Sequence, residues 1–340
     1  HGWTVDGEGR AMHKSLGNGM DPNEIINKYG ADLLRLWAAS ADYHADVRCS
    51  DAIFKQLSQN YLKFRNTARY CLGNLNGFDP NQLVAPGDML ELDRWAMTKL
   101  NALIDKCFAG YDCYDFSAIT HAVNDFCVVD MSNFYLDIIK DRLYCEAPDS
   151  LSRRSAQTAM YLVLDTMTKL MAPILAFTCD EIWQAMTHAD GDDGRNVVFN
   201  DMNQPFTDYA LDEAAMARWD TIIALRDDVN KALELARNEK RVKKNQDAAV
   251  TLYLDEAART GLAAALRPDL ADICIVSSVE VAAGAGEGYQ GQTGAVIAVK
   301  ASQDPKCPRC WNHDPEADPE TGLCPRCASV VLLLNPENLD

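Results

Sequence analysis

The sequence predicts a mainly α protein, with a helix bundle followed by a small α+β unit that ends in a zinc ribbon. Three observations support this fold class. Apolar residues recur at helical spacing through most of residues 50–190. Short β-branched runs separated by glycines replace that pattern after residue 245. Two closely spaced cysteine pairs stand near the C-terminus. A chain of 340 residues is long enough for two or three units, each with its own core.

The composition restricts the class of function. A net charge of −18 argues against coating nucleic acid over the whole surface, because phosphate binding relies on Lys and Arg, so any such surface must be local. No apolar run is long enough to span a bilayer and no secretory leader opens the chain, which predicts a cytoplasmic protein without membrane contact. The opening run His1–Val5 is typical of the inside of a folded unit, so we expect the chain to be cut from a larger protein.

The first 48 residues are predicted to be a glycine-rich loop followed by short helices. Asp21 is a typical N-cap, Pro22 suits the first helical position and Glu24 suits the third. Gly30 fits a C-terminal cap, and helical spacing resumes over residues 31–39. This segment therefore predicts two consecutive helices.

Long amphipathic helices are predicted for the domain 49–190. They start at Ser50–Asp51 and continue over about 92–104, 116–144 and 152–173, with a short one around Ile182–Trp183. Pro173 ends or kinks the fourth. Such a series predicts a helix bundle.

A connecting helix and a small α+β domain are predicted for residues 191–300. A polar connection over 188–210 precedes a helix over 211–241. The predicted strands are Val250–Leu254, Ile273–Val276 and Ala295–Val299. The stretch Gly284–Gly294 favours a hairpin or loop over a phosphate cradle, because no helix begins after it.

The last predicted domain, residues 301–340, contains two C-P-R-C knuckles with thirteen residues between them. The four predicted ligands of one structural Zn²⁺ are Cys307, Cys310, Cys324 and Cys327. The alternative is a pair of redox dithiols, which a reducing compartment disfavours. His313 lies close by, but four cysteines already complete a tetrahedral shell.

Aromatic and basic residues near the knuckles suggest contact with RNA. Trp311 follows the first knuckle, and Arg309 and Arg326 lie within the two knuckles, an arrangement that suits stacking on an unpaired base. Packing of Trp311 against neighbouring strands is the alternative. A basic stretch adds Arg237, Lys240, Arg241, Lys243 and Lys244. Its alternative is a solvated helix end whose cations favour the dipole.

A loop over Gly9–Asn18 presents Lys14 and Ser15 between glycines, just before the capped helix. A lysine on such a loop can stabilise the negative charge that develops on a departing phosphate. Loops of this composition are common on protein surfaces, so the composition alone indicates little.

Several runs of residues carry a family resemblance. They are Met12–Asn18, Tyr29–Trp37, Leu92–Trp95, Asn133–Tyr144 and the terminal knuckles. Together they resemble the class I aminoacyl-tRNA synthetases and, within that class, the isoleucyl enzymes of bacterial type, over essentially the whole chain. Met12–Asn18 resembles the K-M-S-K-S signature loop, although Ala11 replaces its first lysine and His13 its middle serine.

The resemblance implies a fold, a reaction and partners. Residues 1–48 would end a Rossmann-type catalytic domain and residues 49–190 would bind the anticodon region. The reaction joins isoleucine to ATP, with Mg²⁺, releases pyrophosphate and charges the isoleucine tRNA. It implies that Lys14 is catalytic and that Met12, His13, Lys14 and Ser15 contact ATP. The family's H-I-G-H element and editing insert are missing.

We therefore expect the chain alone to bind tRNA and zinc, as a monomer, without catalysing the reaction. One alternative is a non-enzymatic tRNA- or protein-binding module derived from such an enzyme. Another is a valyl or leucyl member of the class, which the run Asn133–Tyr144 and the knuckles disfavour.

Overall fold

The structure, a computed structural model, describes residues 1–334 and divides into two compact units. The first unit comprises His1–Asp137 and Arg154–Ala210; the second comprises Ile138–Arg153 and the chain from Leu211 onward. Residues 335–340, the end of the predicted zinc domain 301–340, lie outside the described residues. No helix among residues 1–334 combines the length and the apolar character that crossing a bilayer requires.

The N-terminal segment of the first unit carries the lysine loop. Its elements are β1 (Thr4–Val5), the 3-10 turn η1 (Lys14–Leu16), α1 (Pro22–Tyr29), α2 (Ala31–Ser40) and β2 (Val47–Arg48). β1 and β2 pair in parallel. The predicted cap of α1 is confirmed, because the Asp21 side chain accepts a hydrogen bond from the Asn23 backbone amide. Gly30 separates the two helices at a φ of 90°, a value that favours glycine.

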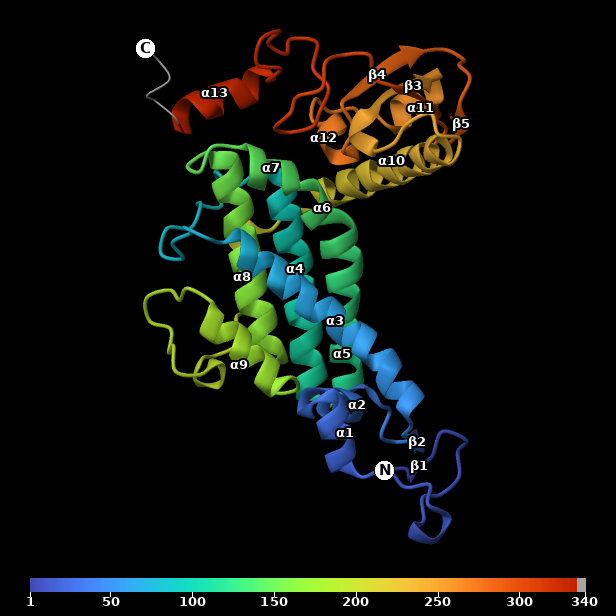
Figure 1. The fold of residues 1–340 in the computed structure, drawn as a ribbon, viewed down its shortest axis with the longest axis vertical. Helices are drawn as coiled ribbons and strands as arrows, with labels where there is room; N and C mark the ends of the chain where they lie inside the picture. The colour runs from blue at the N-terminus through green and yellow to red at the C-terminus, as the bar shows by residue number, and fades with distance from the viewer. Residues whose placement is uncertain (335–340) are drawn as a thin grey trace. The chain divides into compact units, whose positions relative to one another are not determined.

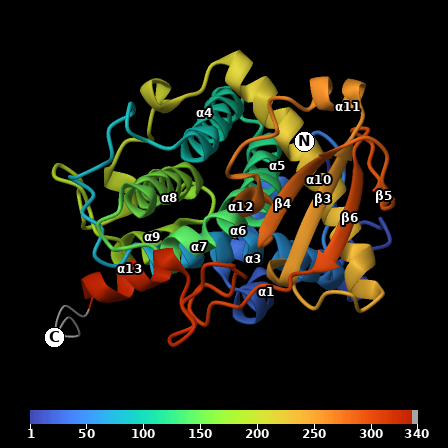
Figure 2. The same ribbon diagram turned by 90° about the horizontal axis from the view of Figure 1, so that it is seen from above.

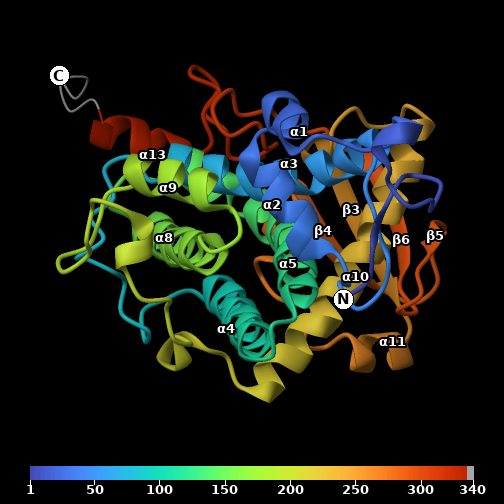
Figure 3. The ribbon, with the colours of Figure 1, turned by 90° about the horizontal axis from the view of Figure 1, so that it is seen from below.

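Long helices lie side by side in the rest of the first unit (Figures 1 and 3). They are α3 (Asp51–Asn74), α4 (Glu91–Asp112), α5 (Phe116–Asp125), the π-helix η2 (Phe126–Tyr135), α8 (Leu151–Met171) and α9 (Ala176–Ala185), followed by the turns η3 (Val197–Phe199) and η4 (Thr207–Tyr209). Every residue of α8 from Ser155 to Met171 is buried. Asp93 is also buried, and it accepts hydrogen bonds from Tyr135 and Ser155. The predicted helix bundle is confirmed.

The prediction of a single helix over 116–144 is wrong in detail. The chain changes to a π-helix at Phe126, continues in α6 (Leu136–Ile138), is interrupted at Ile139 and ends in α7 (Lys140–Cys145). A π-helix keeps the chain helical while shifting which residues face the core, so apolar periodicity does not reveal it.

The second unit packs a helix on a four-stranded sheet. Its elements are α10 (Glu213–Asn238), η5 (Asn245–Asp247), β3 (Ala248–Leu254), α11 (Glu256–Gly261), α12 (Leu270–Cys274), β4 (Ser278–Ala283), β5 (Tyr289–Gln290), β6 (Val296–Ala301) and α13 (Pro325–Leu334). The strand order is β4-β3-β6-β5, with β3 and β4 parallel and the other pairs antiparallel. Helix α10 runs along one face of this sheet (Figure 2). The predicted α+β unit and its glycine-rich hairpin are confirmed.

The prediction of a strand at Ile273–Val276 is wrong. Ile273 and Cys274 end helix α12, Ile275 adopts a left-handed conformation with a φ of 58°, and the strand β4 begins at Ser278. A short apolar run predicts burial but does not by itself distinguish a strand from a buried helical turn. Ile273, Cys274 and Val276 are indeed buried.

Candidate functional site

The four predicted zinc ligands meet at one buried point in the second unit. The first knuckle is a tight turn in which the Trp311 amide donates to the Cys307 carbonyl at 3.0 Å and the Cys307 amide donates to the Asn312 carbonyl at 2.9 Å. The second knuckle is the start of helix α13, with Pro325 at its first position. The four Sγ atoms lie within 4.8 Å of one another, and every one of these cysteines is buried.

This donor set fits a structural zinc ion. Four thiolates complete a tetrahedral shell and leave no position for water or substrate. Burial raises the pKa values of Cys310 and Cys324. Burial also acts on Cys307, but backbone amides of Cys310 and Cys324 that donate to its sulfur outweigh it and lower the pKa of Cys307 to about 6. Amides directed at sulfur are the arrangement that a thiolate ligand requires.

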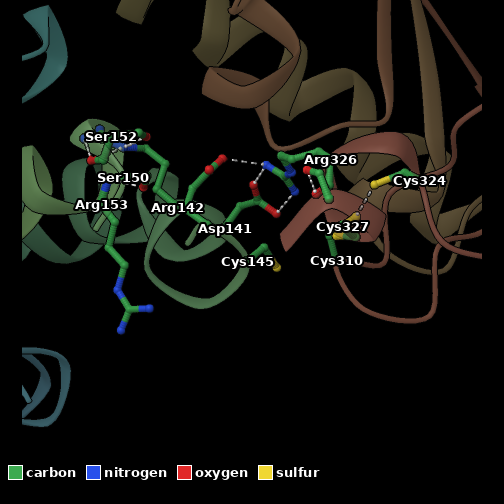
Figure 4. A network of polar contacts seen from close by, with 12 residues as sticks. Asp141, Arg142, Cys145, Ser150, Ser152, Arg153, Cys310, Cys324, Arg326 and Cys327 are labelled. Atoms are coloured by element: carbon green, nitrogen blue, oxygen red, sulfur yellow. Dashed lines mark hydrogen bonds and ion pairs between the residues drawn. The ribbon is translucent and has the colours of Figure 1, made fainter. Parts of the chain in front are cut away.

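Both knuckle arginines are bound to α7, within the same unit, and Figure 4 shows Arg326 beside Asp141. Arg326 makes two hydrogen bonds to the carboxylate of Asp141 and one to Glu146 at 3.4 Å. Arg309 donates to the Cys145 carbonyl and lies 3.5 Å from the Cys327 sulfur. Four thiolates around a divalent cation leave net negative charge, so the guanidinium of Arg309 partly compensates it.

A fifth thiol packs against the cluster without belonging to it. Cys145, the last residue of α7, is buried against the four ligands. Burial is the main reason that its pKa rises to about 12. Cys145 therefore remains a neutral thiol and serves as packing between α7 and the knuckles.

The lysine loop forms the second candidate site. Met12 packs against the small core of Ile25, Cys49 and Phe54. His13, Lys14 and Ser15 are exposed. Among residues 1–334, the Lys14 side chain has no hydrogen bond, ion pair or ring contact, although its backbone carbonyl accepts the Gly17 amide at 3.2 Å. Its ammonium group is therefore available to an anionic ligand.

The predicted tRNA-binding residues separate into three groups. Lys244 lies over the ring of Trp311 at 4.7 Å from its centroid, and the Trp311 side chain is 53% exposed. Lys240 and Lys243 are exposed, and their side chains have no polar partner in the described part of the chain. The remaining arginines bind protein groups: Arg237 donates to Asn245, Arg241 to Glu239 and Val299, and Arg309 and Arg326 to α7. The structure thus brings Lys244 and Trp311 together on an exposed surface.

Sequence reasoning missed the residues that support these sites. Asp141, Glu146 and Cys145 hold the knuckles but lie far away in the chain, and no local pattern connects them with cysteine spacing. The position of each arginine between two ligand cysteines was the available signal, because a guanidinium so close to thiolates and buried groups is expected to have an anionic partner, as Arg309 has in the Cys327 sulfur and Arg326 in Asp141. Asp6 and Asn18, at the ends of the lysine loop, were also missed.

Three family models match separate parts of the chain. Residues 1–50 match "tRNA synthetases class I (I, L, M and V)", residues 93–252 match "Anticodon-binding domain of tRNA ligase" and residues 304–330 match "Zinc finger found in FPG and IleRS". The zinc-finger match covers all four buried cysteines, and the class I match covers the lysine loop.

Curated relatives match nearly the whole chain. The isoleucine–tRNA ligases of Syntrophotalea carbinolica, Geobacillus kaustophilus and Geobacter sulfurreducens are 45%, 46% and 47% identical to it, each over 97% of this chain. The chain spans about a third of the length of these relatives, 36% in each case. A ternary LeuRS–tRNA–LeuAMS structure from Agrobacterium radiobacter K84 matches with a TM-score of 0.45 and 16% identity, covering 75% of this chain and 25% of that one.

Proposed function

We propose, on the premise that this chain belongs to the isoleucine–tRNA ligase family, that it supplies the signature loop, the anticodon-binding bundle and the zinc site of such an enzyme. The whole protein would join isoleucine to ATP, with Mg²⁺, and transfer the aminoacyl group to the isoleucine tRNA. The observation that carries the proposal is the continuous match at 43–47% identity from the lysine loop to the zinc knuckles. The relatives in this match are named isoleucine–tRNA ligases.

Each part of the chain has a role in this proposal. Lys14 places its unpartnered ammonium beside the phosphates of ATP and stabilises the charge that develops on the departing pyrophosphate. His13 and Ser15 contact the same ligand, and Met12 anchors the loop to the core beneath it. The residues that complete the active site lie in the part of the relatives that this chain does not span.

The zinc ion, when bound, supplies the bonds that hold the two knuckles in one fold. The knuckles in turn fix Trp311 beside Lys244, and these two residues, with Lys240 and Lys243, form the surface that contacts tRNA. The bundle would bind the anticodon region of the same tRNA. None of the twelve cysteines forms a disulfide, which favours a reducing compartment such as the cytoplasm. We propose that the protein acts there as a monomer.

A tRNA titration tests this function. The chain, loaded with zinc, is titrated against fluorescently labelled isoleucine tRNA and against the same transcript with an altered anticodon. We expect tighter binding of the unaltered transcript, because the bundle reads the anticodon region. Equal affinity for both transcripts would remove the anticodon-binding assignment, and retention of a protein partner with no tRNA binding would favour the non-enzymatic module.

A further inference from the structure

Side chains, as well as the backbone, close the lysine loop. Asn18, at the end of the loop, accepts a hydrogen bond from the His13 amide at 2.9 Å through Oδ1. Its Nδ2 donates to the Ala11 carbonyl at 3.1 Å and to Asp6 Oδ2 at 2.9 Å. The Asn18 carboxamide therefore connects Ala11 and His13, within the loop, to Asp6, which precedes it.

Asp6 is the other half of this closure. Although it lies beside an exposed loop, the residue is only 7% exposed. Its Oδ1 accepts the amides of Glu8 at 3.0 Å and Arg10 at 2.9 Å, and its Oδ2 accepts Arg10 Nε at 2.9 Å in addition to Asn18. These hydrogen bonds, the one from Asn18 first, hold the pKa of Asp6 well below its usual range. Both oxygens of an ionised carboxylate are thus satisfied.

The position of Lys14 depends on these two residues. Lys14 is the first residue of the 3-10 turn η1. His13 precedes the turn, and its amide donates a hydrogen bond to Asn18. Gly17 follows the turn in a left-handed conformation with a φ of 63°. The Lys14 side chain itself is anchored by nothing in the described residues, so only the backbone of the turn determines where its ammonium group lies. That backbone is held by Asn18 and, through Asn18, by Asp6.

We propose that Asp6 and Asn18 are positioning residues that close the signature loop and set the location of Lys14 for ATP. This proposal rests on the proposed function of Lys14. The contacts of this pair are made entirely between residues of the chain, so they can position the loop without help from a ligand. Since Asp6 carries a full negative charge next to the Asn18 amide, an acceptor in place of that amide breaks the closure by repulsion.

Substitutions at the contact separate positioning from a general effect on folding. Asn18→Asp keeps an acceptor for the His13 amide but sets a second carboxylate against Asp6. Asp6→Asn combined with Asn18→Asp restores a donor–acceptor pair with the roles exchanged. Hydrogen exchange of the amides of residues 9–18 is measured in the chain, and isoleucine-dependent ATP–pyrophosphate exchange is measured in the full-length protein.

We expect Asn18→Asp to speed amide exchange in the loop by about tenfold or more, with unchanged exchange in α4 and α8. In the full-length protein kcat should fall by about tenfold or more, because a small misplacement of a catalytic group is costly. The exchanged pair should recover part of the loss in both measurements, because it restores the contact between positions 6 and 18 but leaves the Ala11 carbonyl without its donor. Lys14→Ala should lower kcat by about 100-fold or more while leaving loop exchange unchanged, and Asn66→Asp, the same change on the exposed side of α3, should affect neither.

The outcomes distinguish this inference from the proposed function. If Asn18→Asp leaves loop exchange unchanged, or if the exchanged pair shows no recovery relative to Asn18→Asp alone, Asp6 and Asn18 do not position the loop. If the loop loosens as expected but Lys14→Ala retains full ATP–pyrophosphate exchange, the closure is real and the catalytic role of Lys14 is wrong.

Discussion

In the signature loop the important cation, Lys14, has no partner among the described residues, whereas in the zinc knuckles both cations, Arg309 and Arg326, are bound to protein groups. The loop is exposed and is closed by Asp6 and Asn18 around a turn of three residues. The four knuckle cysteines are buried, and the half-buried arginines between them bind α7, Arg309 lying also close to the Cys327 sulfur.

The difference matches what the two proposed roles require, a loop that binds a ligand and a metal site that stabilises the fold. A side chain that is to bind an anion must keep its donors unpaired until the anion arrives, and the structure around it must do the positioning. A structural metal site has the opposite requirement, since every donor left unsatisfied next to a buried charge costs stability. Lys14 fits the first description, and Arg309 and Arg326 fit the second.

Removing zinc should produce the largest effect in the chain. Cys324→Ser, or treatment with a strong chelator, should abolish stoichiometric zinc and unfold the knuckles, because structural zinc in small modules contributes roughly 10–16 kcal/mol of apparent binding free energy. Hydrogen exchange should rise over residues 304–330 and in α7, which the knuckles hold, while α4 and α8 keep their protection. Cys113→Ser removes an exposed thiol outside the cluster and is the control. Retention of one zinc per chain by Cys324→Ser would contradict the four-cysteine assignment.

Lys14→Ala should have the next largest effect, confined to catalysis. Loss of a charge that contacts the phosphates mainly in the transition state should lower kcat of the full-length protein by about 100-fold or more. Zinc content and tRNA affinity should not change. Lys63→Ala, an exposed lysine on α3, serves as the matched control in the ATP–pyrophosphate exchange assay. A rise in KM for ATP with unchanged kcat would instead make Lys14 a ground-state binding residue.

Local signals in the sequence were enough to predict much of both sites. The spacing of the knuckles predicted four converging thiols, because each pair is only three residues apart and its geometry is local. Asp21 and Pro22 predicted the start of α1 for the same reason. Exposure of the lysine loop followed from its glycines and polar residues.

The contacts that the sequence did not reveal are non-local. Arg326 pairs with Asp141, 185 positions earlier in the chain, and nothing in either segment specifies the other. The run Ile273–Val276 was misassigned because burial, which it shares with a strand, is set by the tertiary environment. The π-helix beginning at Phe126 was likewise hidden, since an extra residue in a turn does not interrupt an apolar pattern.

Arg326→Met should loosen α7 from the knuckles without removing a zinc ligand. It leaves the carboxylates of Asp141, Glu146 and Asp272 without their shared cation, so we expect a loss of about 2 kcal/mol in the stability of the second unit. This is less than the roughly 3–5 kcal/mol for a fully buried pair, because Arg326 is partly exposed. Urea unfolding followed by a probe in the second unit measures it.

The pH dependence of this loss has a defined sign. Burial first, and then Asp141, already raises the pKa of Asp272 in the folded protein, and removal of Arg326 raises it further. An acid whose folded pKa exceeds its unfolded pKa stabilises the fold when protonated, and that stability is lost as pH rises through the folded pKa. The difference between Arg326→Met and the original chain should therefore be smaller at pH 5 than at pH 8. A difference that grows on acidification would mean that Arg326 does not compensate these carboxylates.

The smallest expected effect is on tRNA binding, and it comes from substitution of Trp311, the exposed aromatic residue next to the first knuckle. Trp311 turns outward from the first knuckle at a φ of 68°, and Lys244 covers its ring. If the pair contacts tRNA, Trp311→Ala should weaken tRNA binding about tenfold, or about 1.4 kcal/mol, since stacking on a base contributes roughly 1–3 kcal/mol. Zinc content should stay at one per chain, because Trp311 is not a ligand.

Two further variants show whether stacking or charge is responsible. Trp311→Phe keeps an aromatic face and should retain most of the affinity, whereas Lys244→Met removes the charge and should reduce the salt dependence of binding by about one phosphate contact. Leu333→Ala, on the exposed side of α13, is the control for a nearby apolar truncation. If Trp311→Ala binds tRNA normally, the exposed ring only packs against Lys244, and the knuckle region supports the fold without reading RNA.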